Sequence, residues 1–124
     1  MQYNERKKEH ASLNKRLGSY IDDIVKQLGW DEHIKDVAHN NLNLLDPEFL
    51  HYESLTTKSE IATAAAIVGL GARYAGVDQK KDEKGLIEKL VECDLCRSVH
   101  LYPQYIWAKQ KRIRDELKKK IEPS

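Results

Sequence analysis

The sequence has few residues that break a helix and no stretch long enough to cross a membrane. Only three prolines and six glycines occur in 124 residues, which favours long helices. No run reaches the ~18 apolar residues of a membrane helix, and the basic start MQYNERKKEH is not followed by the apolar core of a secretory signal. These absences predict an intracellular, cytoplasmic protein, nuclear if its host is eukaryotic, without a membrane partner.

Cysteine is also scarce, and the two that occur form a Cys93-x-x-Cys96 motif. Zinc takes about four ligands, so His100 would have to be a third and His51 or His10 a fourth. A redox CxxC is typical of a βαβ setting, which this pattern lacks. Three interpretations stay open: ordinary thiols near a helix end, a metal site that includes Cys93, Cys96 and His100, or a reversible disulfide. The first is favoured, so no cofactor is predicted.

Catalytic patterns are missing from the sequence as well. The five histidines show no HExxH spacing, and the numerous carboxylates are scattered. Pairs such as Asp22-Asp23 are typical of solvated helix faces and helix starts. No nucleophile stands in a recognisable pattern with a base, so the chain is predicted not to be an enzyme, and a small-molecule substrate is not expected.

What the sequence does contain is helical periodicity. Apolar residues recur at three- and four-residue spacing in five stretches, and no strand-like alternation competes with them. We therefore predict an all-α, five-helix bundle in a single domain over residues 12–121, preceded by a flexible basic segment, residues 1–11. With their caps included, the predicted helices cover residues 12–28, 31–45, 57–75, 86–95 and 103–121.

Capping residues set the predicted bounds of these helices. Ser12 and Asp31 are suitable N-caps, Gly29 and Gly76 suit left-handed C-terminal positions, and Thr57-Lys58-Ser59-Glu60 fits a capping box. Pro103 suits the first turn of the last predicted helix.

A loop, DPEFLHYESLT, is expected between the second and third helices because Pro47 disfavours helix in the residue before it. Its apolar residues Phe49, Leu50 and Tyr52 either lie back on the core or, where exposed, form a contact surface for a partner protein.

The third predicted helix, within SEIATAAAIVGLGARYAGV, is rich in alanine and glycine. A dinucleotide-binding loop would need a third glycine where Tyr74 stands and a strand before it. A membrane helix would need greater length and would not carry Arg73. A helix that is apolar on nearly all sides is a buried helix, and small residues let neighbouring helices approach closely. We therefore predict a central helix around which the others pack.

The same stretch resembles the cyclin-type repeat of the archaeal transcription factor B and eukaryotic general transcription factor family. The resemblance lies in Ser59, the alanine cluster 64–66, Gly71-Ala72-Arg73 and Ala75-Gly76-Val77, and extends in kind over residues 12–120. It implies a five-helix domain with a central third helix and a role in transcription. The family carries two tandem repeats and a zinc ribbon, whereas this sequence holds one repeat and no ribbon.

The resemblance also implies a DNA-contacting element. In the family, helices four and five of the second repeat form a helix-turn-helix, which corresponds here to residues 86–95 and 103–120. The link between these two helices is longer in this sequence than a tight helix-turn-helix allows.

Charge is unevenly distributed along the chain. Residues 97–124 carry a net charge of +5, whereas the rest carries −4. The last predicted helix has Ile106, Trp107, Ile113, Leu117 and Ile121 as its expected inward residues. Its basic residues are expected to face outward and to contact phosphates; they are Lys109, Lys111, Arg112, Arg114, Lys118, Lys119 and Lys120. Base contacts, if made, are expected from Gln104, Lys109 and Arg112.

These observations predict a transcription-associated regulator that binds duplex DNA, a transcription-factor protein, or both. The alternative is a protein-interaction adaptor without nucleic-acid contact, for which Phe49, Leu50 and Tyr52 are the candidate residues. A weaker third class is a metal-responsive regulator using Cys93, Cys96 and His100.

Overall fold

The computed structural model describes residues 3–76, 93–97 and 103–121, and all regular structure in these ranges is helical. The prediction of an all-α bundle is confirmed. The helices are α1 (Tyr3–Leu28), α2 (Glu32–Leu44), α3 (Pro47–Glu53), α4 (Thr57–Tyr74), α6 (Asp94–Arg97) and α7 (Pro103–Ile121).

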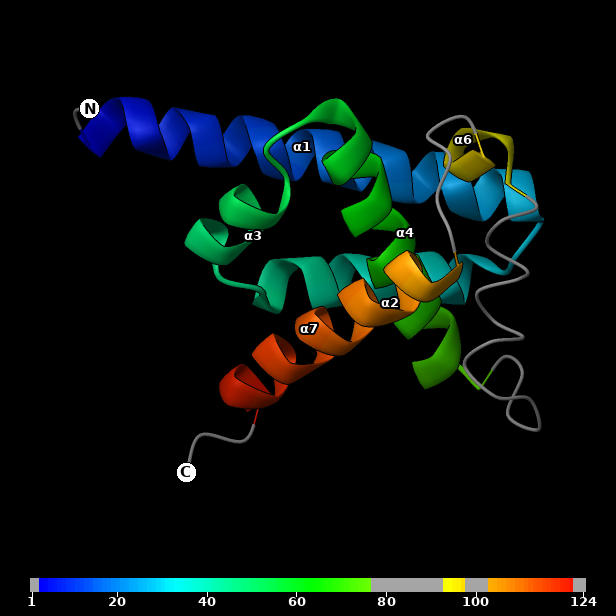
Figure 1. The fold of residues 1–124 in the computed structure, drawn as a ribbon. Coiled ribbons are helices and arrows are strands. Elements are labelled where there is room, and N and C mark those ends of the chain that lie inside the picture. The colour runs from blue at the N-terminus through cyan, green and yellow to red at the C-terminus, as the bar shows by residue number, and fades with distance from the viewer. Residues whose placement is uncertain (1–2, 77–92, 98–102, 122–124) are drawn as a thin grey trace.

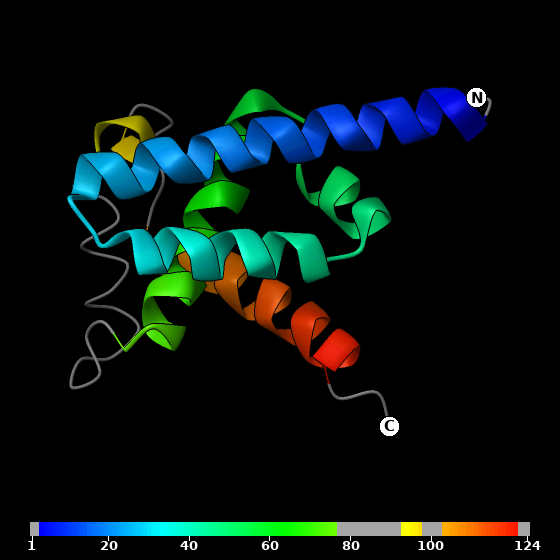
Figure 2. The same ribbon diagram turned by 180° about the vertical axis from the view of Figure 1, so that it is seen from behind.

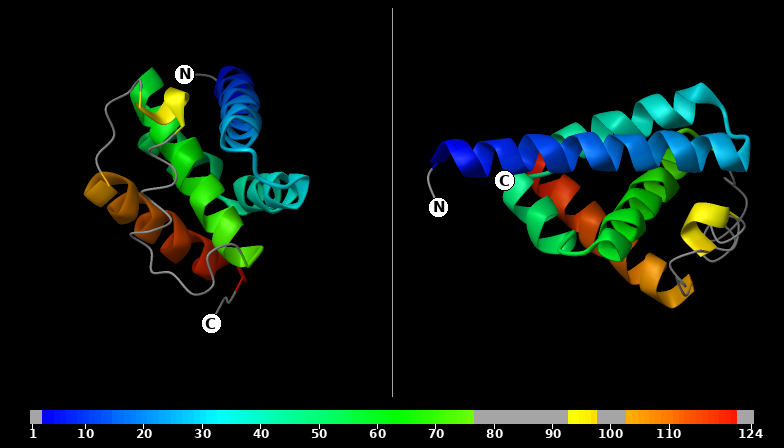
Figure 3. Two further views of the ribbon diagram at one scale, coloured as in Figure 1. Left: turned by 90° about the vertical axis from the view of Figure 1, so that its right-hand side faces the viewer. Right: turned by 90° about the horizontal axis from the view of Figure 1, so that it is seen from above.

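Helices α1 and α2 run antiparallel, and α4 lies between this pair and α7 (Figures 1 and 2). The turn from α1 to α2 passes through Gly29, whose φ of 67° is left-handed, as a C-terminal glycine stop requires. Helix α4 contacts α1, α2, α3, α6 and α7, and the left view of Figure 3 shows it in the middle of the molecule. The four long helices therefore share one core.

The alanine- and glycine-rich helix is buried on all sides. Every residue from Glu60 to Ala72 is buried, which confirms the prediction of a central helix. The largest fully buried side chains come from α4 itself and from three helices around it, namely Leu17, Ile21 and Ile24 of α1, Leu50 of α3, Ile67, Val68 and Leu70 of α4, and Ile106, Ile113 and Leu117 of α7.

At Gly71, α4 packs closely against α2. A Cβ at this position would lie 3.2 Å from the Ala38 Cβ, the Ala38 backbone nitrogen and the Ile34 carbonyl oxygen. Two of these neighbours are backbone atoms, which cannot move aside as the end of a flexible side chain can. The absence of a side chain at Gly71 therefore permits the close packing of α2 on α4.

Helix α1 begins earlier than the sequence analysis predicted. It starts at Tyr3, so the segment expected to precede the domain belongs to its first helix. Ser12 lies within this helix and is not its N-cap; its Oγ accepts a hydrogen bond of 2.7 Å from Nη1 of Arg16. The physical reason is that the segment has no proline or glycine before Gly18 and is rich in good helix formers.

The N-cap of α2 is the predicted residue, Asp31. The N-cap of α4 lies one residue before the predicted Thr57. The Asp31 carboxylate accepts from the backbone N–H of His33 at 2.8 Å. In α4 the cap is Thr56, whose Oγ1 accepts from the N–H of Ser59 at 3.0 Å. The predicted box between Thr57 and Glu60 is therefore wrong, and Glu60 makes a different contact, described below. Gly76, with a φ of 90°, follows α4 in the left-handed conformation expected.

The expected loop between α2 and the central helix contains a short helix, α3. Asp46 is its N-cap and accepts from the Glu48 N–H at 2.8 Å, with Pro47 in the first turn. Proline suits this position because its missing N–H would have no partner inside the helix. The Asp-Pro pair therefore both ends α2 and starts α3.

The predicted helix over 86–95 lies mostly outside the described residues, apart from its overlap with α6 at 94–95. Among the helices that the structure describes, none is both long enough and apolar enough to cross a membrane.

Candidate functional site

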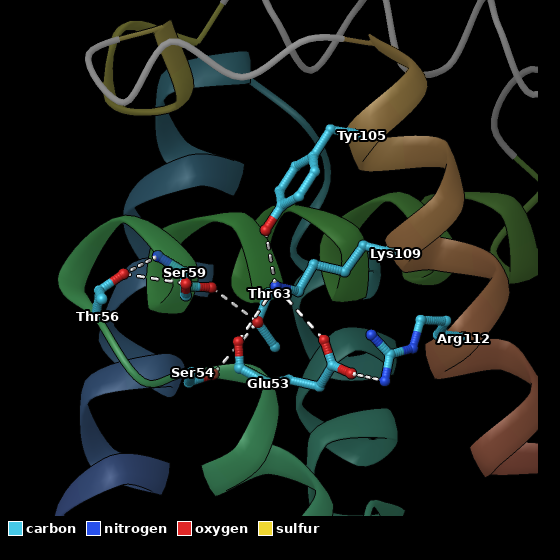
Figure 4. A network of polar contacts seen from close by, with 8 residues as sticks. All are labelled: Glu53, Ser54, Thr56, Ser59, Thr63, Tyr105, Lys109 and Arg112. Atoms are coloured by element: carbon cyan, nitrogen blue, oxygen red, sulfur yellow. Dashed lines mark hydrogen bonds and ion pairs between the residues drawn. The ribbon is translucent and has the colours of Figure 1, made fainter.

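Two cations of α7 meet one carboxylate at the end of α3 (Figure 4). Nζ of Lys109 lies 3.5 Å from Oε2 of Glu53, and Nη2 of Arg112 lies 2.6 Å from Oε1 of the same side chain. The Lys109 ammonium also donates to the Glu53 carbonyl oxygen at 3.2 Å and to the Tyr105 hydroxyl at 3.4 Å. Glu53 and Lys109 are buried, whereas the Arg112 side chain is 57% exposed.

The placement of Lys109 corrects the sequence analysis. This residue was expected on the outer side of the helix among the phosphate-contacting cations, but it is only 6% exposed and points toward α3. Its ammonium lies 5.3 Å from the centroid of the Tyr105 ring, a cation–π contact. Lys109 therefore has structural partners, and its charge is offset by Glu53.

Hydroxyl groups support the segment that carries Glu53. Ser54 Oγ donates to Thr63 Oγ1 at 3.2 Å, and Thr63 Oγ1 donates to the Ser59 carbonyl at 2.8 Å. Thr56 Oγ1 also donates to Ser59 Oγ at 3.0 Å. These bonds join the end of α3 to the first turns of α4 and stabilise the turn next to Glu53 (Figure 4).

The buried side of α7 differs from the one predicted. Ile106, Ile113 and Leu117 are buried as expected, but Trp107 is 52% exposed and Ile121 is 58% exposed. At about 100° per residue, these two lie beside the buried stripe rather than within it. The positions between the buried apolar residues are filled by Lys109 and by Gln110, which is 2% exposed.

The outer side of α7 carries a row of cations next to Trp107. Lys111 and Lys118 are exposed, Arg114 is half-buried, and helical geometry places all three within about 60° of Trp107. We call Trp107, Lys111, Arg114 and Lys118 the basic stripe. It holds three of the seven predicted phosphate-contacting residues on one surface.

The other two basic residues near the end of α7 have acidic neighbours. Nζ of Lys119 lies 3.8 Å from Glu116 Oε2, although its side chain is 76% exposed. Nζ of Lys120 lies 3.5 Å from Asp46 Oδ2, which joins the end of α7 to the start of α3. The backbone N–H of Glu48 lowers the pKa of Asp46, and the nearby Lys120 lowers it further.

Gln104, a predicted base-contacting residue, has a side chain outside the described part of the structure.

The candidate partner-binding residues do not form one exposed surface. Leu50 is fully buried in the core, and Phe49 is half-buried against it. Only Tyr52, at 68% exposure, projects into solvent, and Leu55, at 69%, is an exposed neighbour that the sequence analysis missed. The reason is that α3 is amphipathic, so one face of it packs on α1 and α4.

The three interpretations of the Cys93-x-x-Cys96 motif depend mostly on side chains outside the described part of the structure. Cys93 is a buried free thiol whose Sγ donates to Oε1 of Gln27 at 3.3 Å. The side chain of Cys96 and the whole of His100 lie outside the described residues. Within the described residues, no three histidine, cysteine or acidic side chains are grouped to hold a metal ion.

An ion pair between α1 and α4 was not foreseen. Nε and Nη2 of Arg16 donate to Oε1 of Glu60 at 2.9 and 2.7 Å, and the hydrogen bond to Glu60 raises the pKa of Arg16. The pair borders an open hollow of about 410 Å³ between α1 and α3, lined by Lys8, Glu9, Ser12, Arg16 and His51. Its fixed positive charges are balanced by Glu9 and by Glu60, so the hollow does not select for an anion.

Comparison with protein-family models, with curated proteins and with solved structures finds no match to this chain.

Proposed function

We propose that this protein is a single cyclin-like repeat that acts in transcription by binding duplex DNA through α7, a transcription-factor protein, or both. The observation that supports DNA contact most directly is the basic stripe. Its lysines project from a helix whose opposite side, at Ile106, Ile113 and Leu117, is buried in the core. A rigidly mounted row of cations is suited to phosphate groups.

The cyclin-like part of the proposal is supported by the arrangement of the helices. The resemblance implies a central, alanine-rich third helix, and α4 lies between the α1–α2 pair and α7. Lys111 and Lys118 are the principal phosphate-contacting residues in this proposal, because Lys109 and Arg112 are paired with Glu53. The proposal assigns no catalytic step to the chain.

The expected signature is salt-dependent binding to a duplex. Each neutralised phosphate contributes about 0.9 to the slope of log K against log salt concentration. Replacing Lys111 and Lys118 together by glutamine should therefore weaken binding at low salt and reduce the slope by about 2. Fluorescence anisotropy with a labelled duplex across a salt series measures both quantities.

Lys15 and Lys26 of α1 provide the matched control. Both are exposed, and the Lys15→Gln/Lys26→Gln variant removes the same charge from the other side of the molecule. It should retain the slope of the unaltered protein. If the two variants lost duplex affinity equally, the effect would depend on net charge and not on the position of the lysines. If the unaltered protein bound no duplex at any salt concentration, the DNA-binding proposal would be rejected.

A protein-interaction adaptor remains the second candidate because Tyr52 and Leu55 are both more than two-thirds exposed. In that case a partner captured from nuclease-treated host extract should be retained by the Lys111→Gln/Lys118→Gln variant. It should be lost from a Tyr52→Ser/Leu55→Ser variant. The opposite pattern would favour α7 as the contact surface.

A further inference from the structure

Three charged groups meet at Glu53, and one of the two cations is in excess. Lys109 approaches Oε2 of the carboxylate at 3.5 Å and Arg112 approaches Oε1 at 2.6 Å (Figure 4). The Lys109 ammonium is buried and also donates to the Glu53 carbonyl oxygen and the Tyr105 hydroxyl. A buried ammonium needs its counter-charge, and one carboxylate balances one ammonium. Arg112 is therefore the surplus cation of this cluster.

The contact of Arg112 with Glu53 is close but poorly directed. Although Nη2 lies 2.6 Å from Oε1, this oxygen accepts no hydrogen bond from the residues that the structure describes. Guanidinium–carboxylate pairs are strong when their N–H groups point at the oxygens. Ion pairs that are open to water contribute little to stability. Because its side chain is 57% exposed, Arg112 can leave Glu53 at a small cost.

Arg112 also lies next to the basic stripe. It follows Lys111 in the sequence, so the two residues are about 1.5 Å apart along the helix axis and about 100° apart around it, and both are exposed. A guanidinium has five N–H donors in a planar fork that matches a phosphate group. A phosphate backbone bound at Lys111 therefore passes close to Arg112 and offers it acceptors for several of its donors.

We propose that Arg112 leaves Glu53 and contacts a phosphate when α7 binds a duplex, so that Glu53 competes with DNA for this guanidinium. Lys109 stays buried during the exchange and keeps the Glu53 carboxylate neutralised. The inference rests on the proposed DNA contact of α7. It adds a third phosphate-contacting residue to Lys111 and Lys118, and it identifies Glu53 as the residue that limits the contribution of Arg112.

The salt dependence of duplex binding tests whether Arg112 reaches a phosphate. Arg112→Gln should reduce the slope of log K against log salt concentration by about 0.9, the contribution of one neutralised phosphate. Fluorescence anisotropy with a labelled duplex across a salt series measures this slope. Lys26→Gln removes one exposed positive charge from α1 and should retain the slope of the unaltered protein. If Arg112→Gln also retained it, Arg112 would stay on Glu53 in the complex, and the inference would be overturned.

Removing the competing carboxylate should strengthen binding. The double variant Glu53→Leu with Lys109→Met deletes the buried pair together, so it leaves no lone buried charge and does not change the net charge. Arg112 is then released from Glu53. The affinity for the duplex at low salt should rise roughly 1.5- to 5-fold, the equivalent of one ion pair open to water. Adding Arg112→Gln to this variant should abolish the gain, because Glu53 acts through Arg112.

The outcomes separate this inference from the function on which it rests. If the double variant gains no affinity, or keeps its gain after Arg112→Gln is added, Glu53 does not compete with DNA and the inference is wrong, whereas DNA binding by α7 is retained. If circular dichroism shows that the double variant does not fold, the slope measured with Arg112→Gln decides. If the unaltered protein binds no duplex, the DNA-binding proposal and this inference both fail.

Discussion

Replacing Glu53 by alanine should lower the free energy of unfolding by about 3–5 kcal/mol, because it leaves the Lys109 ammonium buried without its counter-charge. Lys109 and Glu53 are 6% and 7% exposed, so water cannot readily take the place of the missing carboxylate. Arg112 is 57% exposed and keeps its hydration when the pair is broken. Urea denaturation followed by circular dichroism measures the change.

Asp23 is a suitable control for the loss of one acidic residue. It is exposed on α1, and Asp23→Ala should change stability by no more than about 0.5 kcal/mol. A double variant, Glu53→Leu with Lys109→Met, replaces the buried pair by apolar side chains and should recover most of the lost stability. If Glu53→Ala were as stable as Asp23→Ala, the Lys109 ammonium would be hydrated in solution, and the expected loss of stability would be contradicted.

Leu50→Ala should lower the free energy of unfolding by about 2–5 kcal/mol, the usual range for a buried leucine replaced by alanine. Leu50 is fully buried and belongs to the core cluster that includes α1, α4 and α7. Tyr52, two residues later on the same helix, is 68% exposed, and Tyr52→Ala should change stability by no more than about 0.5 kcal/mol. Chemical denaturation of the two variants side by side gives the comparison.

The contrast between Leu50 and Tyr52 also decides how partner binding should be tested. A loss of binding in Leu50→Ala would follow from unfolding, whereas a loss in Tyr52→Ala would report a contact. If both variants were equally stable, α3 would not be packed on the core in solution, and the loop expected from the sequence would be the better description.

The local sequence was sufficient to predict most of the helices. Three- and four-residue spacing identified α1, α2, α4 and α7, and Asp31 and Gly29 marked their ends because caps act through neighbouring backbone groups. The small residues of α4 predicted its central position, because a helix without a polar face has to be buried. Helix α3 is the exception, because the same Asp46-Pro47 pair that ends α2 also starts α3, and the pair alone does not distinguish a loop from a new helix.

The candidate site was predicted less well than the fold. The sequence predicted a surface position for Lys109 and a core position for Trp107, because charged residues generally prefer water. The structure places Glu53 opposite Lys109, which supplies a counter-charge and makes burial of the ammonium possible. Glu53 lies 56 residues earlier in the chain, so no local pattern connects the two residues.

Residue type and spacing within a few turns are sufficient to predict that the described residues are helical, that α4 is central and that α7 carries an excess of positive charge. The burial of Lys109 beside Glu53 and the exposure of Trp107 on α7 were not predictable from such local patterns. Those facts depend on where α3 lies against α7, and such long-range contacts are set by the packing of the whole core.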